Sequence, residues 1–199
     1  VSLEELHQHK DGYMNFSNAV LNVRTLDTMP HSPSFGFFQT LPFAYDKYAK
    51  APLFDKFLMD ICKGNELKAE TIKEYMGYCI SGDPCWLQKA LLLYGTGANG
   101  KSVLMETVSA LVGKDAYAAV PLQDLEQDTM RYLIANKLFN YSEETSLRAL
   151  SDSSLFKTLV TGGNITIRQL YAQPYIAENR TKLIISANQL PQTRDTSNG

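Results

Sequence analysis

Long apolar runs are absent from this sequence, and none approaches the roughly 20 residues that span a bilayer. The first residues, from Val1 onward, lack the basic flank and apolar stretch of a signal peptide. Only three cysteines occur, without a Cys-x-x-Cys pair, which argues against a disulfide framework and against a thiolate zinc site. These absences exclude the membrane and secreted classes and predict a cytoplasmic protein with reduced thiols.

An excess of positive charge is also missing. Nineteen Lys and Arg residues against 21 Asp and Glu residues give a formal net charge of −2. Diffuse attraction to nucleic acid or to an acidic membrane therefore cannot be the main source of binding, and any phosphate contact must be local. The 199 residues, 44% of them hydrophobic, suffice for one substantial core with a small appended lobe.

Three regions follow one another along the chain. Residues 1–50 mix turn formers with aromatics and predict short strands and loops. Residues 51–88 predict a helical lobe, with one helix from Pro52 to about Gly64 and a second from Leu67 to about Ile80. Residues 89–199 alternate strands and helices, which is the pattern of a mostly parallel sheet flanked by helices. The predicted fold class is therefore α/β with a small helical or mixed N-terminal lobe.

Within residues 89–199, apolar strands are predicted at residues 90–94, 117–120, 138–141 and 183–186. A helix is predicted from Lys101 to Val112, with Val103, Leu104, Val108 and Leu111 facing inward. Shorter helices are expected around Met130 to Ile134 and from Ser154 to Val160.

The sharpest motif is a glycine-rich loop that satisfies G-x-x-x-x-G-K-[ST] between a predicted strand and a predicted helix. Its residues are Gly95, Thr96, Gly97, Ala98, Asn99, Gly100, Lys101 and Ser102. Glycines let successive N–H groups point inward, and the helix start adds partial positive charge. Lys101 can reach the outer phosphates, and Ser102 is placed to ligate Mg²⁺. The motif predicts a bound nucleotide, ATP, with Mg²⁺.

An acidic pair follows the next long apolar strand. Hydrolysis needs a carboxylate at a neighbouring strand end, and Glu143 and Glu144 supply it. We assign Glu143 to the metal shell and Glu144 to the attacking water, although a Glu at the metal position leaves the order of the two roles open. The alternative is two solvated glutamates at the start of a loop.

A third strand ends in Asn188. A neutral amide beside the phosphate loop can donate to the γ-phosphate or hold the attacking water without adding charge. Asn188 is thus the predicted γ-phosphate sensor, and the alternative is a turn-forming Asn that precedes a proline.

Together these segments resemble the superfamily 3 helicases, and most closely the primase-helicase replication proteins of phages, plasmids and large DNA viruses. The likeness covers nearly the whole chain and includes the segments at residues 15–21, 41–46, 77–79, 99–102, 142–144, 161–171 and 188–191. It implies an AAA+-like P-loop core that assembles into a homo-oligomeric ring, commonly a hexamer, and translocates on single-stranded DNA in a bacterial or phage-infected cell. It also implies that residues 164–179 form a hairpin that lines the central channel.

The residues of that hairpin region fit a DNA contact. Residues 157–182 contain four basic residues and one acid, whereas residues 121–156 contain three basic residues and six acids. Lys157 and Arg168 are the predicted phosphate contacts, and Tyr171 and Tyr175 could stack on bases. The alternative is a solvated hairpin with packing tyrosines.

One departure concerns the end of the chain. The resemblance implies a further strand and a trans-acting arginine, which we expect beyond Gly199, so that the chain is a C-terminally truncated core that binds ATP better than it hydrolyses it. Two rival functions stay open: a P-loop ATPase that remodels protein, and a nucleotide-gated DNA-binding or assembly module without productive turnover.

Overall fold

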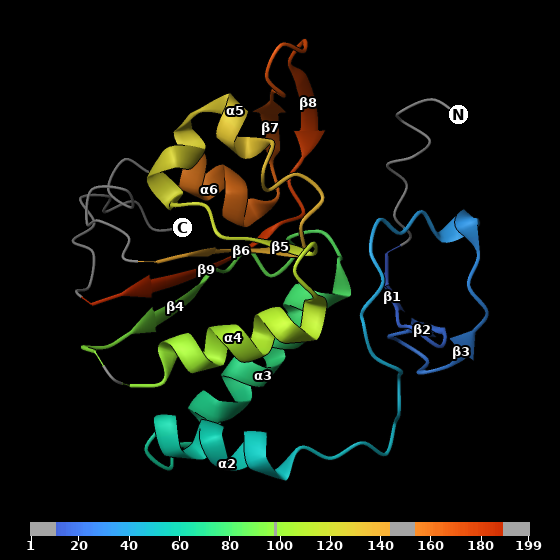
Figure 1. The fold of residues 1–199 in the computed structure, drawn as a ribbon, viewed down its shortest axis with the longest axis vertical. Coiled ribbons are helices and arrows are strands. Elements are labelled where there is room, and N and C mark those ends of the chain that lie inside the picture. Colours follow the sequence, from blue (N-terminus) through green and yellow to red (C-terminus); the bar gives the residue numbers. More distant parts are fainter. Residues whose placement is uncertain (1–10, 98, 144–153, 189–199) are drawn as a thin grey trace.

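The computed structural model describes residues 11–97, 99–143 and 154–188. At its centre is a four-stranded parallel sheet with the order β4-β9-β6-β5 (Figure 1). Its strands are β4 (Leu91–Tyr94), β5 (Tyr117–Ala118), β6 (Phe139–Ser142) and β9 (Lys182–Ala187). Because every pairing is parallel, the carboxyl ends of the strands meet at one edge of the sheet.

Helices cover both faces of this sheet. The two inner strands, β6 and β9, are buried along their whole length, as expected for strands packed on both sides. One face contributes Ile184 to a core shared with α3 (Glu66–Ser81) and α4 (Lys101–Val112). The other contributes Leu183 and Ile185 to a core shared with α6 (Ser154–Thr161) and the short segments η2 (Leu122–Glu126) and α5 (Asp128–Arg131). The predicted α/β architecture, a parallel sheet flanked by helices, is confirmed at this level.

The chain before the sheet forms the predicted short strands and then two helices. An antiparallel sheet contains β1 (Tyr13–Asn15), β2 (Val20–Asn22) and β3 (Thr28–Met29), and η1 (Pro33–Phe35) follows. Helix α2 (Pro52–Ile61) begins at a proline, and the Asn65 side chain caps α3 by accepting from the Lys68 N–H at 3.0 Å. The division at residues 50 and 88 stays a prediction, and both helices contribute to the core that also contains α4.

A separate two-stranded hairpin projects from the sheet, as predicted for this region. It contains β7 (Asn164–Ile167) and β8 (Tyr175–Glu178), paired antiparallel from Asn164↔Glu178 to Ile167↔Tyr175. The hairpin leads through three residues into β9, the strand whose far end reaches the phosphate loop.

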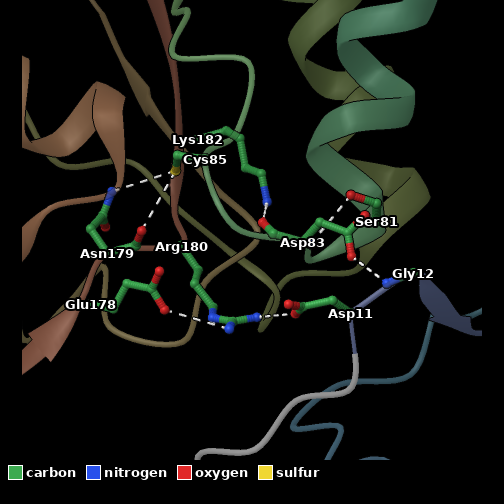
Figure 2. A network of polar contacts seen from close by, with 9 residues as sticks. All are labelled: Asp11, Gly12, Ser81, Asp83, Cys85, Glu178, Asn179, Arg180 and Lys182. Carbon is green, nitrogen blue, oxygen red and sulfur yellow. Dashed lines mark hydrogen bonds and ion pairs between the residues drawn. The ribbon is translucent and has the colours of Figure 1, made fainter.

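A dense polar network surrounds the joint between the hairpin and β9 (Figure 2). Asn179 donates from Nδ2 to the Leu159 carbonyl at 2.7 Å, and Thr181 donates from Oγ1 to the Ile134 carbonyl at 2.8 Å. Lys182 is 2% exposed and donates to the carbonyl oxygen of Asp83. Because these three polar side chains are hydrogen bonded within the fold, they hold the base of the hairpin against the sheet.

The N-terminal segment is attached at the same place. Arg180 Nη1 lies 2.7 Å from Asp11 Oδ1, and the Gly12 N–H donates to Asp83 Oδ1 at 2.7 Å (Figure 2). The start of β9 is therefore the point where the hairpin, the N-terminal segment and the segment that connects α3 to β4 meet.

Two sequence predictions about helices are wrong in detail. Val103 was expected to face inward but is 52% exposed, because the buried stripe of α4 runs through Leu104, Val108 and Val112, four residues apart. The helix expected to run through Ile134 ends at Arg131, after which turns continue to Asn136.

The described ranges contain no helix long and apolar enough to cross a membrane.

Candidate functional site

The predicted phosphate loop connects β4 to α4 at the carboxyl edge of the sheet. Its first glycine is tied to the neighbouring strand, because the Gly95 N–H donates to the Ala187 carbonyl at 3.1 Å. Lys101 Nζ donates to the Gly95 carbonyl at 2.5 Å, to Asn99 Oδ1 at 3.1 Å and to Asn188 Oδ1 at 3.4 Å. The ammonium group therefore lies within the loop and next to the end of β9, surrounded by neutral oxygen acceptors.

Neighbouring side chains approach two glycines of this loop closely. Gly100 has φ +82°, and a Cβ there would lie 2.6 Å from Ile61 Cγ2 of α2. A Cβ on Gly95 would lie 1.9 Å from Asn99 Nδ2. The loop thus closes more tightly than any side chain at these positions allows without displacing its neighbours.

The first turn of α4 faces this loop with its backbone donors. Gly100 is the N-cap residue and supplies no side-chain hydrogen bond to the turn. The N–H groups at the start of the helix, together with its partial positive charge, form a favourable position for an anion. Ser102 is exposed at the same turn.

A cavity of about 350 Å³ lies beside the loop, within the size range of small-molecule sites. It is lined by Gly97, Asn99, Gly100, Lys101, Ser102, Val103, Tyr141, Glu143, Ser186 and Asn188. The structure thereby brings together residues from the phosphate loop, from β6 and from β9. Of the other predicted site residues, Gly95 contributes through its carbonyl and exposed Thr96 is not part of the lining, while Ala98 and Glu144 lie outside the described residues.

Tyr141 and Ser186 were missed in the sequence. Tyr141 is 8% exposed and Ser186 is 6% exposed, and both line the cavity together with Glu143. Burial raises the pKa of the Tyr141 phenol above its ordinary value of 10.0. Strand alternation was the available signal. Tyr141 precedes Glu143 by two residues and Ser186 precedes Asn188 by two residues, and residues two apart in a strand lie on the same face.

The donors around the cavity fit a magnesium ion that is held mainly by a bound ligand. Ser102 and Glu143 offer two oxygen ligands, and the described ranges contain no group of three His, Cys, Asp or Glu side chains arranged to hold a metal ion. Mg²⁺ typically uses one or two protein oxygens plus phosphates and waters, which matches this set.

The three predicted DNA contacts lie away from the cavity. Tyr171 is fully exposed in the turn of the hairpin, with φ +64°. Arg168 Nε lies 3.4 Å from Asp128 Oδ2, so part of its charge is already balanced inside the chain, and exposed Lys157 is on α6. The strand β9 connects the hairpin at its start to the cavity at its end.

A larger cavity of about 830 Å³ lies between the N-terminal segment and the hairpin. Phe38, Tyr132 and Tyr175 are among its lining residues, and none of the phosphate-loop residues belongs to it. The smaller cavity is the better candidate site, since it contains the uncapped helix start, the lysine and the carboxylate.

Two family models match parts of the chain. A family model described as "Family of unknown function (DUF5906)" matches residues 93–198, and a second model, "D5 N terminal like", matches residues 1–63. No curated protein matches the chain.

Solved structures share the fold. An A-form apo structure of the NrS-1 C-terminal region is 14% identical, with a TM-score of 0.59, and the match covers 78% of this chain and 35% of that one. Another apo structure of the NrS-1 C-terminal region is 12% identical, with a TM-score of 0.62, covering 100% of this chain and 61% of that one. The chain thus spans less than two thirds of the structures that it matches.

Proposed function

Since the chain belongs to the family of unknown function DUF5906, we propose its activity from the site itself: it is the ATP-dependent motor of a DNA helicase in a replication protein. In this proposal MgATP occupies the cavity beside the phosphate loop. Hydrolysis takes place at the interfaces of a homo-oligomeric ring, a hexamer, that moves on single-stranded DNA.

One observation carries the proposal: Lys101, Glu143 and Asn188 come from three separate parts of the sequence and line one cavity at the start of α4. Parallel strands place their carboxyl ends at a common edge, where ligands bind in open α/β sheets. A cation, a carboxylate and a neutral amide around an uncapped helix start match the needs of a bound triphosphate.

Binding would exchange the neutral partners of Lys101 for charged ones. The ammonium now donates to a carbonyl and to two amide oxygens, and phosphate oxygens form stronger, charge-assisted hydrogen bonds. The first N–H groups of α4 would complete the phosphate contacts. Mg²⁺ would be held by Ser102 and Glu143, and when bound it neutralises charge on the phosphates.

Two further residues are assigned to the chemical step. Glu144 is proposed to orient the attacking water and accept its proton while the bond between the γ-phosphorus and the bridging oxygen breaks. Asn188 is proposed to contact the γ-phosphate through its amide group. Because Asn188 follows β9 directly, loss of that contact on hydrolysis can reach the hairpin through a single strand.

DNA contact is assigned to the hairpin and to α6. Tyr171 offers an exposed ring for stacking, and Lys157 and Arg168 offer positive charge. The pairing of Arg168 with Asp128 keeps the guanidinium near the hairpin strand and available for exchange with a phosphate.

The comparisons support the broad class of protein in this proposal. The D5 N-terminal-like match and the fold shared with the NrS-1 C-terminal region are in keeping with a replication protein of the primase-helicase type.

The proposal is tested by ATP hydrolysis of a longer protein that includes the arginine-bearing segment expected beyond Gly199, with and without a single-stranded oligonucleotide, and with unfolded protein as the alternative stimulant. We expect stimulation by the oligonucleotide alone, and its loss in Tyr171→Ala and Arg168→Ala. Arg24→Ala, which removes an equivalent exposed charge from the N-terminal segment, is the matched control. Stimulation by unfolded protein instead would favour a protein-remodelling ATPase, and nucleotide binding without turnover would favour an assembly module.

A further inference from the structure

Strand β7 of the hairpin contacts α5 as well as its partner strand β8 (Figure 1). Arg131 Nη1, at the end of α5, donates to the Thr166 carbonyl at 2.9 Å. The Arg168 N–H donates to the Asp128 carbonyl at 3.1 Å, and the side chains of the same two residues form an ion pair. Both backbone contacts are made by β7 or by the residue directly after it, so they fix the strand itself. The hairpin is therefore docked on the segment between β5 and β6.

Arg131 joins two segments through one guanidinium group. Its Nε donates to the Leu125 carbonyl at 2.7 Å and its Nη2 donates to the Glu126 carbonyl at 2.7 Å. These are the last two residues of η2, and the end of a helix leaves carbonyl groups without intrahelical partners. Because a guanidinium presents its donors in a fixed planar fork, it can hold these two carbonyls and that of Thr166 at once. The side chain therefore ties the end of η2 to the hairpin.

The start of η2 is bonded to the strand that leads to the predicted metal ligand. Asn140 on β6 exchanges two hydrogen bonds of 2.9 Å with the backbone of Val120. Ser142 Oγ, at the end of β6, accepts from the N–H of Leu122, the first residue of η2, at 2.9 Å. Asn140 and Ser142 are buried, at 0% and 2% exposed. Ser142 directly precedes Glu143, which lines the cavity beside the phosphate loop. One end of η2 is thus held beside the cavity, and the other end is held at the hairpin.

Packing makes one unit of η2 and the hairpin strand. Their shared core contains two buried residues of η2 and two of β7, namely Leu122, Leu125, Ile165 and Ile167. Because close-packed interiors transmit displacements, a shift at the end of β6 moves η2 and β7 together. This route starts at the acidic strand, so it is separate from the path along β9 that ends at Asn188.

We propose that Arg131 is a positioning residue that couples the nucleotide site to the hairpin: by tying β7 to η2, it lets a change at Glu143 on MgATP binding reach the hairpin. This inference rests on the proposed function, because it takes Glu143 as part of the MgATP site. It adds a residue that lies outside the phosphate loop and the acidic pair. Arg131 does not line the cavity beside the phosphate loop, so it acts through the two segments that it joins.

The test is hydrogen exchange of the amides of residues 164–168, measured by mass spectrometry without nucleotide and at saturating MgATP. It compares the unmodified chain, Arg131→Gln and Lys137→Gln. Lys137→Gln is the matched control, because it removes the same charge and a hydrogen bond to a carbonyl, that of Asp115 at 2.6 Å, outside the hairpin.

In the unmodified chain and in Lys137→Gln, we expect MgATP to slow this exchange about fivefold or more, the size of an ordinary coupling between sites. In Arg131→Gln the slowing should fall below about twofold, while the affinity for MgATP stays within about twofold because the substituted residue is remote from the cavity. A purely structural role for Arg131 would speed exchange equally with and without MgATP and leave the ratio of the two rates unchanged.

Ser142→Ala is the second variant and keeps the test decisive if Arg131→Gln fails to fold. It removes the acceptor of the Leu122 N–H at the other end of the route, so it should reduce the effect of MgATP on residues 164–168 in the same direction. An unchanged ratio in whichever of the two variants folds overturns the inference, even if its melting temperature falls. Absence of slowing in an unmodified chain that binds MgATP overturns it as well. If the unmodified chain binds no MgATP, it is the proposed function that fails.

Discussion

Lys101 Nζ and Asn188 Oδ1 lie 3.4 Å apart, although the two residues are 87 positions apart in the sequence. The contact joins the start of α4 to the end of β9, and it places the predicted phosphate-binding lysine beside the predicted γ-phosphate sensor. Both side chains line the same cavity.

Substitution of Asn188 tests this relationship. Asn188→Asp puts a carboxylate beside the Lys101 ammonium, and the resulting ion pair would compete with a phosphate and repel it. We expect Asn188→Asp to weaken ATP binding at least about tenfold more than Asn188→Ala does, as measured by calorimetry. Equal affinities in the two variants would show that Asn188 does not face the phosphates.

Gly100→Ala should destabilise the fold. Its φ of +82° is unfavourable for alanine, and the new Cβ would lie 2.6 Å from Ile61 Cγ2. We expect a loss of about 1 to 3 kcal/mol in the free energy of unfolding, measured with urea. Gly97→Ala is the control, since a Cβ there has no atom within 4 Å, and its effect should stay within about 0.5 kcal/mol.

The ion pair between Asp11 and Arg180 should couple the N-terminal segment to the base of the hairpin (Figure 2). Both side chains are partly exposed, at 51% and 29%, so the expected coupling energy is small, about 0.2 to 1 kcal/mol. A double-mutant cycle with Asp11→Ala and Arg180→Ala measures it through the free energy of unfolding. The coupling should shrink at 1 M salt; a salt-independent value would mean that packing rather than charge joins the two parts.

Alkaline pH should destabilise the protein through its buried thiols and phenols. Burial raises the pKa of Cys79 above the ordinary 9.0, so the native thiol keeps its proton at a pH where the unfolded one has lost it. The native state then binds more protons, and its stability falls as the pH rises above 9. Urea unfolding between about pH 8 and pH 10.5 should show this fall, by at most about 1.4 kcal/mol per pH unit for one group.

Cys79→Val identifies the contribution of that thiol, because valine fills a similar volume and does not titrate. Its stability should decline less steeply with pH than that of the unmodified protein, while Tyr75 and Cys85, whose pKa values are also raised by burial, maintain part of the slope. Parallel pH profiles for the two proteins would contradict the assignment.

Local patterns in the sequence predicted much of the fold. The apolar runs at β4, β6 and β9 and the stripe on α4 depend on neighbouring residues, and they predicted these elements nearly to their ends. The glycine-rich loop likewise predicted the position of Lys101, since the motif lies within eight residues.

Long-range pairing could not be predicted in the same way. Insertion of β9 between β4 and β6 depends on packing across the whole sheet, and it is this order that pairs Tyr141 with Ile184 and brings Ser186 to the same cavity as Tyr141. The partner of Arg168 is Asp128, 40 residues earlier, and no local pattern connects them. Such contacts arise only when the strands are in register.

The central claim is that the phosphate loop binds ATP with magnesium, and calorimetric titration of MgATP into the unmodified chain, Lys101→Ala and Lys114→Ala tests it most directly. Lys114 is the control because it is an exposed lysine just beyond the opposite end of α4. The account predicts saturable binding to the unmodified chain and to Lys114→Ala, and an affinity lower by at least about tenfold in Lys101→Ala. Binding of equal strength in all three, or in none of them, would contradict it.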